Sequence, residues 1–127
     1  MKALVIDDSR VMRRIVGGIL SDVGFDVVEA GDGREALDQL EQHDDVSLCC
    51  IDWNMPVMNG LEFVVETRKN SQWRDITLMM VTTEGEHGQI VRALAAGAHE
   101  YVIKPFTPEV IVDKLQLLGL VGAKETP

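Results

Sequence analysis

The sequence lacks features of a membrane protein, a nucleic-acid-binding protein or a disulfide-linked protein. No apolar run approaches the length of about 20 residues that a membrane-spanning helix needs, and the apolar stretch before Asp7 is too short for a secretion signal. Basic residues are scarce, 12 against 21 acidic ones, and the net charge of -9 argues against binding phosphate backbones or anionic lipid. The two cysteines, Cys49 and Cys50, are neighbours, and on a strand they would point to opposite faces. We therefore expect a cytoplasmic protein with no membrane insertion, no direct nucleic-acid contact and no disulfide.

The 127 residues, of which 46% are hydrophobic, fit one globular domain with one core. Short apolar runs predict strands at residues 3–6, 27–30, 46–51, 76–81 and 101–103. Between and after these runs, apolar residues recur at helical spacing, and Ser9 and Gly24 are the predicted N-cap and stop of the first helix. The helix markers are Val11, Ile15, Ile19 and Val23; Ala36, Leu37 and Leu40; Leu61, Val64 and Val65; Val91, Leu94 and Ala98; and Ile111, Leu115 and Leu118, which follow Pro108.

Alternation of five apolar strands with five amphipathic helices predicts a doubly wound α/β fold. Parallel strands need long crossover connections, and helical crossovers cover both faces of the sheet. In such folds ligands bind beyond the carboxyl ends of the strands, where the strand order reverses. The residues that follow the strands must therefore be considered together.

Polar residues follow four of the predicted strands: Asp7 and Asp8, Asp52, Thr82 and Lys104. Three neighbouring carboxylates repel one another, so the pKa of at least one should be raised, and the group calls for a cation. Carboxylate ligands suit Mg²⁺, and the set contains no His or Cys that would indicate zinc. Next to such a cation, with Lys104 and Thr82 nearby, Asp52 is placed for nucleophilic attack on phosphorus.

Each of these residues also has an ordinary structural explanation. The acidic pair before Ser9 suits a helix N-terminus, and Asp52 with Asn54 suits a turn. Thr82 with Thr83 could cap a helix, and Lys104 could lie at an exposed strand end. Their joint occurrence at four strand ends of one sheet is what favours a functional site.

The motifs around these positions resemble response regulator receiver domains, in particular the single-domain, CheY-like members. They are Val-Ile-Asp-Asp-Ser at 5–9, Met-Arg-Arg-Ile-Val at 12–16, Asp-Trp-Asn-Met-Pro at 52–56, Val-Thr-Thr-Glu at 81–84 and Tyr-Val-Ile-Lys-Pro-Phe at 101–106. The resemblance implies a flavodoxin-like parallel sheet of order 2-1-3-4-5, a receiver domain over residues 1–121, and a short frayed tail over residues 122–127. It also implies a cis peptide bond before Pro105.

By this resemblance Asp52 accepts a phosphoryl group from a phosphohistidine of a sensor histidine kinase or phosphotransfer protein in two-component signalling. Asp8, Asp52 and the main-chain oxygen of Asn54 would bind Mg²⁺, for which Mn²⁺ could substitute, and Asp7 would act through a bound water. Lys104 would bind the phosphoryl oxygens. Such a chain is not an enzyme but a phosphoacceptor that assists its own phosphorylation and dephosphorylation.

The resemblance also implies a conformational switch and a surface that reads it out. Thr82 would move onto the phosphoryl group and Tyr101 would turn inward, while Asn54 and Glu84 would modulate turnover and Trp53 would report binding by fluorescence. The fourth helix, fifth strand and fifth helix would form the effector surface, with Ile90, Leu94, Tyr101, Ile103, Lys114 and Leu117. The unphosphorylated chain would be a monomer, and activation could produce a dimer.

The start of the fourth helix reads Gly-Glu-His-Gly at residues 85–88, without the paired lysines of enteric chemotaxis members. This departure argues against binding to the flagellar motor. Three alternatives remain: a receiver from a longer regulator with an output domain, a phosphatase of the haloacid dehalogenase class, and a flavodoxin-like electron carrier. The phosphatase needs a carboxylate where this chain has Asn54, and the flavin carrier needs a hydroxyl- and glycine-rich loop at residues 7–10.

Overall fold

A computed structural model describes residues 1–122 and contains, within them, five strands and five α-helices in alternation. The strands are β1 (Lys2–Ile6), β2 (Asp26–Ala30), β3 (Val46–Ile51), β4 (Thr77–Thr82) and β5 (Glu100–Ile103). The helices are α1 (Arg10–Asp22), α2 (Gly33–Gln42), α3 (Gly60–Lys69), α4 (His87–Ala96) and α5 (Pro108–Leu117), with a 3-10 turn η1 (Ser71–Trp73) before β4. The predicted alternation is confirmed; residues 123–127 of the predicted tail lie outside the described residues.

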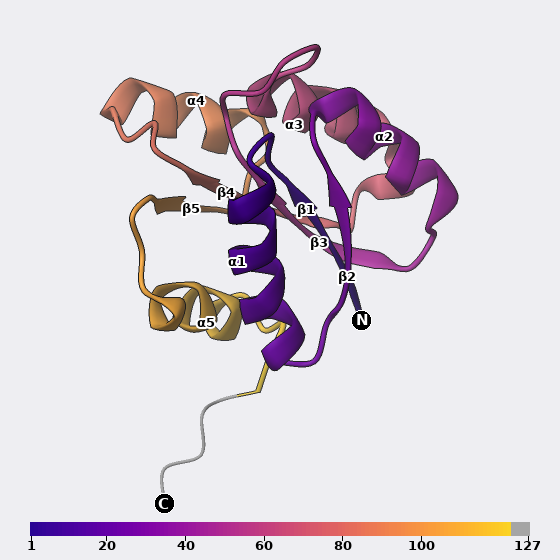
Figure 1. Ribbon diagram of the computed structural model, residues 1–127. Coiled ribbons are helices and arrows are strands. Elements are labelled where there is room, and N and C mark those ends of the chain that lie inside the picture. Colours follow the sequence, from indigo (N-terminus) through magenta and orange to yellow (C-terminus); the bar gives the residue numbers. More distant parts are fainter. Residues whose placement is uncertain (123–127) are drawn as a thin grey trace, which may run out of the picture.

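The sheet is parallel throughout and has the order β2-β1-β3-β4-β5. Helices α1 and α5 cover one face, and α2, α3 and α4 cover the other (Figure 1). The doubly wound fold predicted from the alternation is therefore confirmed, together with the strand order that the family resemblance implied. None of the helices in residues 1–122 is long and apolar enough to span a membrane.

Alternation along each central strand divides the core between the two faces of the sheet. On β1, Leu4 and Ile6 belong to the cluster under α2, α3 and α4, whereas Ala3 and Val5 belong to the cluster under α1 and α5. All four side chains are buried, as a strand covered on both faces requires. The adjacent Cys49 and Cys50 likewise enter opposite clusters as free, buried thiols.

Most helix boundaries follow the local signals in the sequence. Ser9 is the N-cap of α1 and accepts a hydrogen bond from the Met12 amide at 3.2 Å, and Gly24 follows the helix with a φ of 104°. The prediction that Ala98 belongs to the fourth helix was wrong: α4 ends at Ala96, and Gly97, at a φ of 125°, is its C-cap. The peptide bond between Lys104 and Pro105 is cis, as expected.

The start of α3 packs directly against the chain segment that follows β3. The amide of Gly60 donates a 2.8 Å hydrogen bond to the Trp53 carbonyl oxygen. A Cβ on Gly60 would lie 2.1 Å from the carbonyl oxygen of Asp52, far inside van der Waals contact. Only glycine therefore allows this approach of α3 to the end of β3.

Gly60→Ala should accordingly destabilise the chain by about 3 kcal/mol, because backbone atoms must move to admit the methyl group. Gly18→Ala is a matched control within α1, since a Cβ there meets no atom within 4 Å. It should stabilise the chain by up to ~1 kcal/mol through helix propensity. Urea unfolding of both variants measures the difference, and equal effects of the two substitutions would contradict the close approach at Gly60.

Candidate functional site

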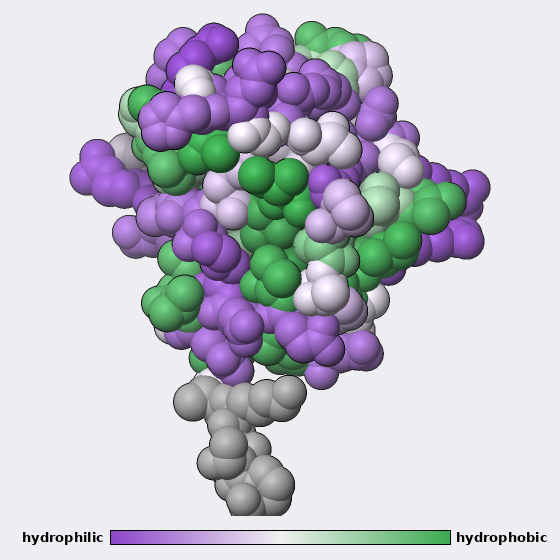
Figure 2. Space-filling model, turned by 90° about the vertical axis from the view of Figure 1, so that its left-hand side faces the viewer, coloured by the Kyte–Doolittle hydropathy of each residue, from purple (hydrophilic) through white to green (hydrophobic). Residues whose placement is uncertain are grey.

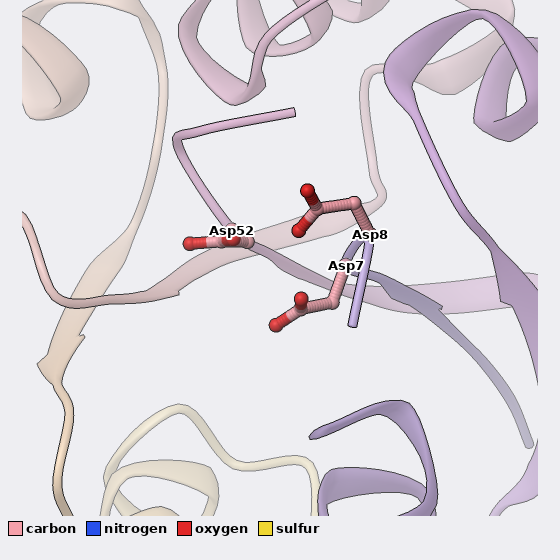
Figure 3. Close-up of side chains that lie close together, drawn as sticks. All are labelled: Asp7, Asp8 and Asp52. Atoms are coloured by element: carbon pink, nitrogen blue, oxygen red, sulfur yellow. The ribbon is translucent and has the colours of Figure 1, made fainter. Parts of the chain in front are cut away.

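Three carboxylates meet beyond the ends of the two central strands. Asp7 and Asp8 directly follow β1, and Asp52 directly follows β3, whose last residue pairs in register with that of β1. One carboxylate oxygen from each residue lies within 4.8 Å of the others, as the close-up in Figure 3 illustrates. Asp7 and Asp52 are buried, while Asp8 is exposed. The predicted convergence of the three acids is confirmed.

Lys104 supplies positive charge to this group from the end of β5. Its Nζ lies 2.7 Å from Asp7 Oδ2 and 3.7 Å from Asp52 Oδ1. Within residues 1–122 no other cationic side chain forms an ion pair with the three acids. Three carboxylates against one ammonium leave the pocket with an excess of negative charge.

The acceptor candidate Asp52 has a raised pKa. Burial is the main cause and repulsion by Asp7 adds to it, while the Thr82 hydroxyl and the Lys104 ammonium oppose the shift. The expectation that one of the three carboxyls has a raised pKa is thus supported for Asp52. A carboxylate held in this way gains stability from any added cation.

Backbone contacts hold the acids in place. The Trp53 amide donates to Asp52 Oδ1 at 2.9 Å, and the Ser9 amide donates to Asp7 Oδ1 at 2.9 Å. Arg13, which the sequence analysis missed, donates from Nη1 to the Asp7 carbonyl oxygen at 2.6 Å. Its position one helical turn after Ser9 was the available signal, because that spacing turns the side chain back toward the helix start.

The two predicted switch residues lie beside the acids, but not quite as expected. Thr82 is the last residue of β4 rather than the residue after it, and it is fully buried. Tyr101 on β5 is only 9% exposed and donates its hydroxyl to the Glu84 carbonyl oxygen. Its ring is therefore buried, and Tyr101 adds little exposed area to the effector surface expected from α4, β5 and α5. Burial, aided by Glu84 and Asp52, raises the pKa of Tyr101.

A hydrogen-bonded chain connects the segment after Asp52 to helix α4. Asn54 Nδ2 donates to Glu84 Oε1, and Gln89 Nε2 donates to Glu84 Oε2 at 3.0 Å. These bonds, that from Asn54 first, lower the pKa of Glu84. Asn54 and Glu84, each expected to be a modulator, thus contact one another, a contact that the sequence analysis did not predict, and Gln89 was missed. Side chains that meet through three separate segments leave no periodic signal in the sequence.

The donor set fits a small hard cation. Asp7, Asp8 and Asp52 offer only oxygen atoms, and an exposed hollow lined by Asp8 and Asn54 adjoins them. Oxygen ligands with room for water are what Mg²⁺ prefers, and zinc sites instead use His and Cys. The residues present therefore fit the Mg²⁺ that the sequence led us to expect.

Comparison with known proteins agrees with this arrangement. The family model for the response regulator receiver domain matches residues 3–116. The chain belongs to this family. It is accordingly a CheY-like receiver domain of two-component signalling.

The receiver domain is similar over nearly its whole length to chemotaxis proteins. It is 48% identical over 126 residues to a chemotaxis protein CheY homolog of Campylobacter jejuni, covering 98% of this chain and 97% of the relative. It is 45% identical over 119 residues to the chemotaxis protein CheY1 of Helicobacter pylori, covering 93% and 96%. Among solved structures, Vibrio cholerae CheY4 superposes with a TM-score of 0.85 at 39% identity, covering 91% of this chain and 96% of that one.

The raised pKa of Asp52 predicts a dependence of stability on pH in the receiver domain without metal. Because the folded chain holds a proton at this carboxyl more readily than the unfolded chain, stability falls as pH rises from the ordinary value of 3.8 through the raised pKa. Asp52→Asn removes this cost, so in EDTA at neutral pH its melting temperature should exceed that of wild type by about 3–5 °C, the effect of about 1 kcal/mol. The gain should shrink as pH falls toward 3.8. An Asp52→Asn variant with the same melting temperature as wild type at every pH would contradict the raised pKa of Asp52.

Proposed function

We propose that the chain is a Mg²⁺-dependent phosphoacceptor, in which a carboxylate oxygen of Asp52 takes a phosphoryl group from a phosphohistidine of a kinase or phosphotransfer protein. The meeting of Asp7, Asp8 and Asp52 with Lys104 at one edge of the sheet carries this proposal. The domain over residues 1–121 acts as a signalling module, not as an enzyme that turns over a substrate. We place it in the cytoplasm, where such kinases present their phosphohistidine.

The transfer itself asks the protein mainly for positioning and charge neutralisation. An Oδ atom of Asp52 attacks phosphorus, the new O–P bond forms as the N–P bond to the donor imidazole breaks, and the imidazole leaves with the electron pair. Hydrogen bonding from the Trp53 amide to Asp52 Oδ1 fixes the carboxylate plane, which leaves Oδ2 for attack. Lys104, which now contacts Asp7, is 3.7 Å from Asp52 and can turn to the phosphoryl oxygens.

Magnesium would be held by Asp8, Asp52 and the Asn54 main-chain oxygen, with Asp7 acting through a water, and Mn²⁺ could replace it. When bound, it neutralises charge on the phosphoryl oxygens. Asp7 and Asp8 keep this position ready, because they follow one strand and face the acceptor on the next. Asn54, two residues after the acceptor, donates to the carboxylate of Glu84, and both would modulate hydrolysis of the acyl phosphate.

Readout of phosphorylation is assigned to the side of the molecule formed by α4, β5 and α5. Figure 2 shows this side, with apolar residues between polar margins. Leu94, Ile103 and Leu117 are exposed there, Ile90 is half-buried, and Lys114 pairs with Glu100 at 3.2 Å. Thr82 and Tyr101 would transmit the change, the receiver being monomeric before phosphorylation and the same apolar side serving a protein effector or dimer afterwards.

The names of the relatives extend this proposal to chemotaxis, but the start of α4 limits it. His87 begins the helix, preceded by Gly85 and Glu86, and this segment has no paired lysines. We therefore propose a protein effector other than the flagellar motor. The same reading holds if the domain is part of a longer regulator, because the acceptor chemistry lies wholly within residues 3–116, the part matched by the family.

The central test follows Trp53 fluorescence in a Trp73→Phe background, which removes the other tryptophan. Mg²⁺ and then acetyl phosphate or beryllofluoride should each change the emission, because the indole adjoins the acceptor. Asp52→Ala should weaken Mg²⁺ binding by about tenfold or more and abolish the second response. Intact-protein mass spectrometry should find one added phosphoryl group only when Asp52 is present. An Asp52→Ala chain that responds to beryllofluoride like wild type would overturn the proposal, and rapid turnover of phosphomonoesters would favour a phosphatase instead.

Lys104→Met separates metal binding from phosphoryl binding. Removal of the ammonium relieves competition for the acids, so Mg²⁺ should bind at least as tightly as in wild type, by up to about tenfold more. The beryllofluoride response should weaken by about tenfold or more, because the phosphoryl oxygens lose their cationic partner. Fluorescence titrations give both constants. Weaker binding of both Mg²⁺ and beryllofluoride would indicate that Lys104 stabilises the fold of the pocket rather than binding the phosphoryl group.

A further inference from the structure

Helix α4 is held to the core by few side chains. Only Ala93 of its ten residues is buried, and its N-cap residue Glu86 makes no side-chain capping bond. Ile90 and Ala96 are partly buried against the hydrophobic cluster under α2, α3 and α4, while Val91 and Leu94 are exposed. Polar contacts therefore contribute a large share of what fixes the position of this helix.

Two such contacts reach the residues that directly follow Asp52. The guanidinium carbon of Arg92 lies 5.9 Å from the ring centroid of Trp53, within the range of a cation–π interaction. Gln89, one helical turn earlier on the same side of α4, is joined to Asn54 through the carboxylate of Glu84. Within residues 1–122 no carboxylate pairs with Arg92. Its guanidinium group instead contacts the Trp53 ring.

Trp53 contacts the acceptor as well as α4. Its amide donates to Asp52 Oδ1 at 2.9 Å, and its carbonyl oxygen accepts from the Gly60 amide at 2.8 Å. The indole is buried, with only 8% of the residue exposed. A change in the orientation of the Asp52 carboxylate must therefore act on the Trp53 backbone, and through the ring on Arg92.

We propose that Arg92 is a positioning residue that couples α4 to the acceptor through Trp53, with Gln89 supporting it through Glu84 and Asn54. This route runs from the segment after β3 directly to α4, and is separate from the pair Thr82 and Tyr101. The inference rests on the proposed function of Asp52, since phosphorylation is the event that the route would carry. Arg92 contacts neither the acids nor a phosphoryl group. It acts by holding the indole of Trp53 between the segment at Asp52 and helix α4.

The test measures amide hydrogen exchange of α4 in the whole chain, with and without Mg²⁺ and beryllofluoride. Arg92→Ala should speed exchange of the α4 amides by about two- to fivefold without ligand, the effect of one exposed cation–π contact. It should also at least halve the slowing that beryllofluoride produces in wild type. Arg92→Lys keeps a cation over the ring and should retain most of both effects. Arg34→Ala is the charge-matched control, because Arg34 lies on α2 in an exposed pair with Asp38.

Two further readouts separate coupling from simple loss of structure. Trp53 emission in the Trp73→Phe background should change on Arg92→Ala and not on Arg34→Ala, while beryllofluoride affinity stays within about threefold of wild type. In Thr82→Val a residual α4 response should persist, and adding Arg92→Ala should remove it. An α4 response in Arg92→Ala equal to that in Arg34→Ala overturns the coupling alone. Failure of the wild-type chain to bind beryllofluoride overturns the proposed function, and the coupling with it.

Discussion

Burial of carboxylates beside one another, at Asp7, Asp8 and Asp52, is the constraint on which the rest of the site depends. The fold places these carboxylates within 4.8 Å of one another and gives two of them little contact with solvent. One ammonium, from Lys104, offsets part of the charge, and the pKa of Asp52 remains raised. The sheet thus places more negative than positive charge in this pocket, so the pocket gains free energy when it binds a cation. With that cation present, the pocket can also accommodate the oxygens of a phosphoryl group.

The parallel sheet brings these groups together. Asp7 and Asp52 end adjacent central strands, and the short approach of α3 at Gly60 keeps the segment after β3 folded over the site. Lys104 directly follows the edge strand β5, its amide donates to the Thr82 carbonyl oxygen at the end of β4 at 2.9 Å, and its long flexible side chain reaches Asp7. Its ammonium can thus change partners without movement of the strand, which a shorter basic group could not do.

Features with a local cause could be predicted from the sequence, and features that depend on distant contacts could not. The burial of both faces of β1, the Ser9 cap and the convergence of the acids follow from periodicity and from the rule for strand ends. The contact of Arg92 with Trp53 joins residues far apart in the sequence, and an exposed arginine on a helix has no sequence signal that identifies its partner. The inward orientation of the Tyr101 ring could not be predicted either, because alternation assigns a strand residue to one face of the sheet but does not determine its rotamer.

The inward position of Tyr101 bears on the free energy that the proposed phosphorylation would have to supply to shift the conformation. Its hydroxyl donates to the Glu84 carbonyl oxygen, and the carboxylate of Glu84 is held by Asn54 and Gln89. The inward position of Tyr101 is therefore one that contacts within the chain stabilise. If Asp52 is the phosphoacceptor, as we propose, phosphorylation would act by shifting a population, and a ligand shifts a population by no more than its differential affinity for the two states. The contacts of α4 with Trp53 and Glu84 would contribute to that difference, because they hold the helix against the segments that follow β3 and β4.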